Sequence, residues 1–139
     1  MGKKIKVVFD TNVWVSISLQ KRPSDEFSQV KHGLTLFVSK DIMLETSKVL
    51  LYPRIAEILR KNGITEKEIL RAIAATSKIV EPTEKLTVVN EDTEDNKILE
   101  CALAAGAEII VSGDKHLLDL RKYGKTRILT PREFFDSYT

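Results

Sequence analysis

The chain has 139 residues, the usual size of one domain, and is long enough to bury a sizeable core. Its formal net charge is only +2, so the field of the whole molecule gives no argument for nucleic acid, and any polyanion has to bind through a local patch. The single cysteine, Cys101, excludes an intrachain disulfide framework and suits a reducing cytoplasm. No apolar stretch approaches the ~20 residues that cross a bilayer, and the N-terminus lacks the pattern of a secretory signal, so we expect a cytoplasmic protein without a membrane segment.

The hydrophobic pattern predicts alternating strands and helices within one domain that covers residues 1–139. The first half contains predicted strands at Ile5–Phe9 and Leu34–Val38 and predicted helices at Asn12–Leu19, Ser24–His32, Lys40–Leu51, Pro53–Lys61 and Glu66–Lys78. Either Ile79–Glu81 or Leu86–Val89 is the third strand, and the pattern does not decide between them. The rest comprises a helix at Glu94–Ala105, a strand at Glu108–Ser112, a short helix at Leu117–Lys122, a strand at Thr126–Leu129 and a last helix opened by the capping sequence Thr130–Glu133.

Four acidic residues fall at one predicted edge of this structure. Alternating strands and helices imply a three-layer α/β/α sandwich around a parallel sheet, and ligands of such sheets bind beyond the carboxyl ends of the strands. Asp10 directly follows the first strand, and Glu45 lies in the early turns of the helix after the second. Asp95 begins the helix after the third-strand region, and Asp114 comes two residues after the fourth strand. We therefore expect the four carboxylates to lie at the same edge of the sheet.

Three of these acids also have a purely structural interpretation. Asp10 stands at a strand–helix junction, where aspartate commonly caps the helix. Asp95 suits the first turn of a helix, where the helix dipole favours a negative charge. Asp114, in the segment SGDKHLL, suits a turn or the N-cap of the short helix that follows. Taken singly, none of the three demands a ligand.

Glu45 is harder to explain by local structure alone. The apolar residues Ile42, Val49 and Leu50 bracket it at helical spacing, so its side chain faces the core or a cleft. Asp95 likewise heads an apolar stripe, with apolar residues three, four, seven and eight positions further on. An unpaired charge in either place is costly, and something has to compensate it.

A divalent cation is the simplest compensation. Converging carboxylates raise one another's pKa values unless positive charge lies between them, and no lysine or arginine is obviously paired with these positions. Ligands that are all oxygen select Mg²⁺ or Mn²⁺, and the sequence has no Cys/His pairs at zinc spacing. Such an ion lowers the pKa of a bound water and neutralises charge on a phosphate, so the predicted site suits phosphoryl chemistry.

The same segments resemble a known family. The chain is similar to the PIN-domain ribonucleases in VVFDTNVWVS, in the glutamate of DIMLETSKVLLYPRI, in EDTEDNKILECALAAGAEIIVSGDKHLL and in ILTPREFF, which together run from Val7 to Phe135. Within the family it most resembles the branch described as toxin components of prokaryotic toxin–antitoxin systems. The resemblance implies a parallel sheet of order 3-2-1-4-5 flanked by helices. It also implies Mg²⁺- or Mn²⁺-dependent hydrolysis of RNA that leaves a 5′-phosphate and a 3′-hydroxyl, inhibition by a small antitoxin protein, and a homodimer.

The resemblance assigns roles residue by residue. Asp10, Glu45 and Asp95 correspond to the three core acids that hold Mg²⁺ or Mn²⁺. Asp114 corresponds to a fourth acidic position, which varies more within the family and is a candidate ligand for a second ion. The supporting positions are Asp92, a peripheral acid shortly before the third core aspartate, and the small polar residues Asn12 and Ser112.

Two other functions compete with this interpretation. A haloacid-dehalogenase-like phosphatase also places an aspartate after its first strand and a GD pair late in the sheet. That class needs a second aspartate two residues on, where this chain has Asn12, and it gives Glu45 no role. A non-catalytic RNA-binding or scaffold domain would retain the fold, but the presence of all four acids counts against it. Four basic residues are candidate phosphate contacts, although solvated surface charge explains any single one of them better: Arg54, Lys115, Arg121 and Lys122.

Overall fold

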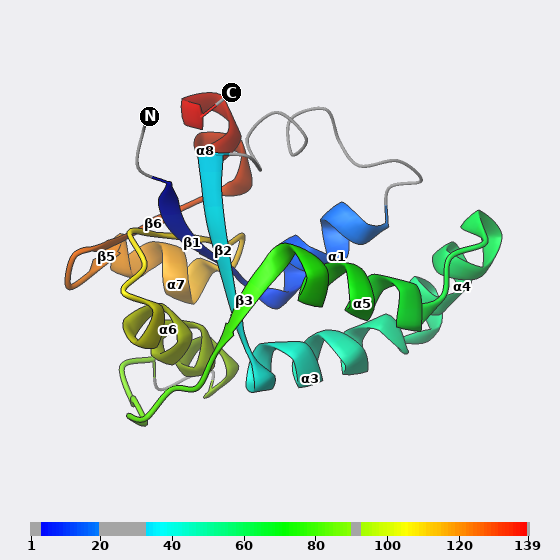
Figure 1. Cartoon of the computed structure of the whole chain (residues 1–139), viewed down its shortest axis with the longest axis horizontal. Coiled ribbons are helices and arrows are strands. Elements are labelled where there is room, and N and C mark those ends of the chain that lie inside the picture. Colours follow the sequence, from blue (N-terminus) through cyan, green and yellow to red (C-terminus); the bar gives the residue numbers. More distant parts are fainter. Residues whose placement is uncertain (1–3, 20–32, 90–92, 139) are drawn as a thin grey trace.

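The computed structural model describes residues 4–19, 33–89 and 93–138, and its central feature is a mostly parallel sheet packed against helices (Figure 1). The strands are β1 (Ile5–Phe9), β2 (Leu34–Ser39), β3 (Ser77–Val80), β4 (Ile109–Val111), β5 (Lys122–Tyr123) and β6 (Thr126–Leu129). The helices are α1 (Thr11–Ser18), α3 (Lys40–Leu50), α4 (Pro53–Asn62), α5 (Glu66–Thr76), α6 (Thr93–Ala105), α7 (Lys115–Leu120) and α8 (Pro131–Tyr138). In the view of Figure 1, α6 and α7 lie on one side of β2, and α3, α4 and α5 lie on the other.

The strand order β3-β2-β1-β4-β6-β5 confirms the predicted α/β fold. The five parallel strands follow the predicted order 3-2-1-4-5, with β6 as the fifth of them. The sixth strand, β5, was not predicted; it is two residues long and pairs antiparallel with β6 at the edge of the sheet. The predicted helix Leu117–Lys122 was wrong at both ends, because α7 begins right after Asp114 and stops before Arg121, which has a φ of 59°.

The third strand lies at the first of the two predicted places. β3 pairs in parallel with Leu36–Ser39 of β2 and overlaps Ile79–Glu81, whereas Leu86–Val89 forms no strand. The predicted helix Glu66–Lys78 was therefore two residues too long. The predicted helix Ser24–His32 lies outside the described residues.

The core forms where the sheet is buried on both faces. Val7, Val8 and Phe9 of β1 are fully buried, as expected of a central parallel strand. The ring of Phe9 makes edge contacts with Trp14 of α1, at a centroid distance of 5.1 Å, and with Phe134 of α8, at 6.1 Å. These aromatic contacts fix both helices next to the end of β1, from which Asp10 follows.

Cys101 of α6 is a buried core residue. Its side chain has no exposed surface, and burial raises the pKa of the thiol to about 12, although a hydrogen bond with Ser39 opposes the shift. A thiol with this pKa is almost entirely protonated at neutral pH, so Cys101 acts as a small apolar side chain.

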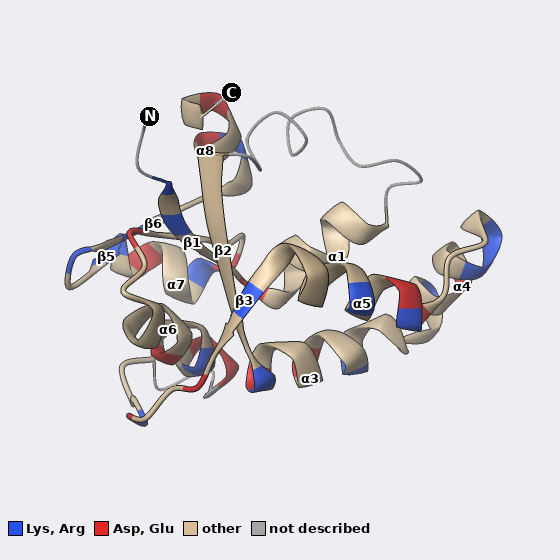
Figure 2. Cartoon of the chain, viewed as in Figure 1, with Lys and Arg blue, Asp and Glu red and all other residues tan. Residues whose placement is uncertain are grey.

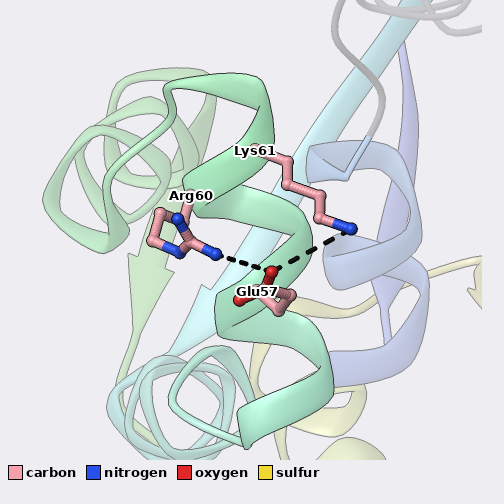
Figure 3. A network of polar contacts seen from close by, with 3 residues as sticks. All are labelled: Glu57, Arg60 and Lys61. Atoms are coloured by element: carbon pink, nitrogen blue, oxygen red, sulfur yellow. Dashed lines mark hydrogen bonds and ion pairs between the residues drawn. The ribbon is translucent and has the colours of Figure 1, made fainter.

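On the surface of α4, one acidic side chain is shared by two cations. Glu57 accepts a hydrogen bond of 2.6 Å from Arg60 and lies 3.9 Å from the ammonium of Lys61 (Figure 3). Because all three side chains are exposed, pairs at this helical spacing add only about 0.3–0.5 kcal/mol each. Glu57 thus offsets part of the positive charge of Arg60 and Lys61 within the same helix.

Candidate metal and active site

A cavity of about 130 Å³ opens at the carboxyl ends of the parallel strands. The four acids singled out in the sequence all line it, although they come from β1–α1, α3, α6 and β4–α7. Its lining residues are Asp10, Thr11, Asn12, Glu45, Val49, Glu94, Asp95, Ile98 and Asp114. The structure therefore brings together carboxylates that are up to 104 residues apart in the sequence, while their role as metal ligands stays a prediction.

Asp10 is held at the end of β1 by two hydrogen bonds. Its Oδ1 accepts from the backbone N–H of Val13 at 3.0 Å, so Asp10 does cap α1, and its Oδ2 accepts from the hydroxyl of Ser112. Only 5% of the residue is exposed. Burial raises the pKa of Asp10 and the negative charge of Asp114 adds to the shift, while the hydrogen bonds from Ser112 and Val13 oppose it. The structural and the functional interpretations of Asp10 are therefore compatible.

The buried hydroxyl of Ser112 connects two of the acids. It donates to the carboxylate of Asp10 and accepts from the backbone N–H of Asp114 at 2.9 Å. Asp114 in turn caps α7, because its Oδ1 accepts from the backbone N–H of His116 at 2.8 Å. Ser112 thus sets the position of Asp10 relative to the turn that carries Asp114.

Glu45 reaches the cavity because α3 begins directly after β2. The hydroxyl of Ser39 accepts from the backbone N–H of Ile42 at 3.2 Å and starts the helix, so Glu45 falls in its second turn. Ile42, Val49 and Leu50 are buried as their spacing predicted, and Glu45 is half-buried among them, next to Val49 at the cavity.

Two side chains of α6 hold the connector that precedes it. The amide of Asn96 accepts from the backbone N–H of Val89 at 2.8 Å and donates to its carbonyl at 2.7 Å. Glu100 accepts from the backbone N–H of Leu86 at 2.9 Å. Asn96 and Glu100 are 5% and 6% exposed, so both are buried polar residues whose hydrogen bonds replace those of the strand that was considered at Leu86–Val89. We call these contacts of Asn96 and Glu100 with residues 86–89 the clamp. Asn96 directly follows Asp95, which is also buried.

We expect Asn96→Ala to lower the free energy of unfolding by about 2–4 kcal/mol, because it leaves the buried N–H and carbonyl of Val89 without their partner. Unfolding in urea at equilibrium measures the loss. The neighbouring change Lys97→Ala is the control: it removes a 3.8 Å ion pair with Asp41 that is partly open to solvent, and we expect at most about 1 kcal/mol. Equal losses for the two variants would contradict the role of the clamp.

The donors around the cavity suit a hard divalent ion. Among the described residues that line the cavity there is no lysine, arginine or histidine, and their charged groups are all carboxylates. Within residues 4–19, 33–89 and 93–138, no three acidic, histidine or cysteine side chains stand close enough together to hold one ion as they are placed. Ion binding therefore requires side chains to turn toward a common point, which the rotatable bonds of the half-buried Glu45 and Asp114 allow.

The cavity also includes residues that the sequence did not single out. Glu94 is an exposed fifth acid, next to Asp95 in the chain, while Val49 and Ile98 supply apolar wall. Asn12 lies at the cavity with an exposed side chain, and its supporting role stays a prediction. Asp92 lies outside the described residues. The only sequence signal for Glu94 was that it directly precedes Asp95 in the chain.

The model of the PIN-domain family matches residues 6–116. The chain belongs to the PIN-domain family. An uncharacterized protein of Methanocaldococcus jannaschii, MJ1680, is 32% identical to this PIN domain over 97% of the chain and 92% of the relative. A solved structure, that of the T. brucei RRP44 PIN domain, superposes with a TM-score of 0.47 at 15% identity, covering 97% of this chain and 80% of that one.

Membership of the family indicates the general kind of activity to expect of the cavity. PIN domains are typically nucleases and generally depend on a metal ion. In the part of the chain that the structure describes, no helix of this PIN domain is long and apolar enough to cross a membrane.

Proposed function

We propose that this PIN domain is a metal-dependent endoribonuclease that hydrolyses phosphodiester bonds of RNA. The observation that carries the proposal is the cavity at the carboxyl ends of the strands, which the carboxylates of Asp10, Glu45, Asp95 and Asp114 line together; the described lining residues include no lysine or arginine. Buried Asp10, whose pKa is raised, favours a positive partner, and a polyanionic substrate cannot approach four carboxylates unless their charge is neutralised.

We assign the following roles to the residues at the cavity. Asp10, Glu45 and Asp95 would hold the first Mg²⁺ or Mn²⁺ ion, with Asp114 available to a second. Such an ion, when bound, activates water and offsets charge on the phosphate. Ser112 keeps the carboxylate of Asp10 in one orientation through its hydroxyl, which fixes a ligand on the rigid end of a strand.

We further propose that the nuclease is the toxin of a toxin–antitoxin pair, as the resemblance in sequence implies. It would then bind a small antitoxin protein and form a homodimer, both in the cytoplasm. If so, the product of the neighbouring gene should co-purify with the chain and inhibit cleavage of RNA. Co-expression of the two genes, followed by affinity purification and sizing, tests the pairing separately from the nuclease activity.

End-labelled RNA tests the activity directly. We expect cleavage with Mn²⁺ or Mg²⁺, none with EDTA, and products that carry a 5′-phosphate and a 3′-hydroxyl. A phosphatase of the haloacid-dehalogenase type would instead turn over a small phosphomonoester and leave the RNA intact, although Asn12 stands where that class needs an acid. A scaffold domain would do neither. Either of the last two results would refute the proposed nuclease.

A further inference from the structure

The edge of the sheet at β5 and β6 concentrates positive charge. Residues 120–132 contain five lysines and arginines and no acid, although the whole chain has an excess of only two. Three of these cations, Arg121, Lys122 and Arg127, lie at the junction of α7 with the antiparallel pair β5–β6, and we call them the cationic edge. Figure 2 shows this basic colour on the hairpin labelled β5. All three residues are exposed.

The acids in the described part of the chain form no ion pairs with the cationic edge. Lys122 of β5 stands directly opposite Arg127 of β6, an arrangement of like charges that destabilises an antiparallel pair. Within the described residues, none of the three forms an ion pair with an acid, and Arg127 only donates to the neutral hydroxyl of Tyr138 at 3.1 Å. Arg60 and Lys61 of α4, by contrast, share Glu57 (Figure 3).

The neighbouring cation Lys125 has a position that suits a structural role. The ammonium of Lys125, in the turn between β5 and β6, would lie 3.9 Å from a Cβ placed on Gly106, where α6 ends. A cation there interacts favourably with the carbonyl end of the helix dipole. Arg121 and Lys122 also follow the carbonyl end of a helix, α7, but that helix has only six residues and does not account for three exposed cations at one place. Their charge therefore suits an anion from outside.

The cationic edge is connected to the cavity by one short helix. Asp114 lines the cavity and caps α7, and Arg121 is the residue at which α7 ends. Six residues of α-helix span about 9 Å. A chain of phosphates that enters the cavity can therefore continue along α7, past the exposed Lys115, to the cationic edge.

We propose that the cationic edge binds the phosphate backbone of single-stranded RNA beyond the bond that is cleaved. This inference rests on the proposed function, because it extends the substrate of the same cavity. The contacts are charges on exposed side chains, which recognise phosphates and carry no information on base sequence. The edge therefore supplies affinity for RNA of any sequence, and its contribution depends on salt.

Binding of a fluorescent single-stranded RNA, measured by anisotropy in EDTA over a series of KCl concentrations, tests the proposal without any cleavage. The variant Arg121→Gln/Lys122→Gln/Arg127→Gln removes three exposed charges. Because each phosphate contact to a single strand contributes about 0.7 to the slope of log affinity against log salt, we expect the slope to fall by about 2. At about 0.1 M salt, affinity should fall roughly 10- to 100-fold.

A matched variant controls for net charge. Lys67→Gln/Arg71→Gln/Lys78→Gln removes three exposed cations from α5 and β3, at the opposite edge of the sheet, and we expect nearly the parental slope. Equal slopes for all three proteins would overturn the proposal. The proposal would also be overturned if the triple variant of the cationic edge bound RNA like the parent but lost binding to polyglutamate. That result would favour an acidic protein partner. Absence of cleavage with Mn²⁺ would refute the proposed nuclease, whereas the salt slope is measured in EDTA and does not depend on cleavage. A failure of the proposed function and a failure of the cationic edge are therefore distinguishable.

Discussion

Asp10→Asn should abolish metal-dependent cleavage of RNA, with initial rates at least about 100-fold below those of the parent. The change removes the charge of a core ligand, and loss of even a group that only supports a metal ligand costs 10- to 100-fold. Because an asparagine oxygen can still accept from the backbone N–H of Val13, the cap of α1 is retained. Rates with end-labelled RNA and Mn²⁺ measure the loss. Asp136→Asn, on the exposed surface of α8, is the matched control and should keep the parental rate.

The same variant should be more stable than the parent in metal-free buffer at pH 7. The pKa of Asp10 is raised in the folded state by burial, so the folded state disfavours the charged form. Protonated Asp10 makes its full contribution to stability below the pKa that it has in the unfolded chain, about 3.9. This contribution is lost as the pH rises through the higher pKa of the folded state. The melting temperature of Asp10→Asn should therefore exceed that of the parent at pH 7 and approach it toward pH 4. A parent that melts higher at pH 7 in EDTA would contradict this account of the buried charge.

Saturating Mn²⁺ should raise the melting temperature of the parent by several degrees. An ion that binds only the folded state stabilises by mass action, by about 2.7 kcal/mol at 100 times its dissociation constant. Asp95→Asn should blunt the shift, because it removes one of the carboxylates that line the cavity. Asp119→Asn, which changes an exposed acid of α7 outside the lining, should leave the shift intact. A parental melting curve that does not move with saturating ion would count against the metal site.

The sheet was predictable because its signals are local and consistent. The buried run of β1 and the cap at Asp10 lie within a few residues of each other, and the parallel order follows once strands and helices alternate. The meeting of Asp10 with Ser112, which are 102 residues apart, then follows from the pairing of β1 with β4. Position relative to a strand end was enough to place all four acids at one edge.

Other features could not be predicted because side chains or single backbone angles decide them. The connector at Leu86–Val89 has strand-like residues, but its backbone is held by the side chains of Asn96 and Glu100, a contact that no periodicity reveals. β5 is too short to produce an alternating pattern, and it exists because Arg121 turns the chain out of α7. The orientation of Glu45 in the cavity depends on rotamers, which the spacing of apolar residues leaves open.

The inaccessible thiol of Cys101 makes the chain a ready background for attaching probes. With no exposed surface and a pKa near 12, it supplies almost no thiolate at neutral pH, so maleimide or methanethiosulfonate reagents should leave the native protein unmodified. A cysteine introduced at an exposed position would then be the sole target for a fluorophore or spin label, with no need to remove the native one.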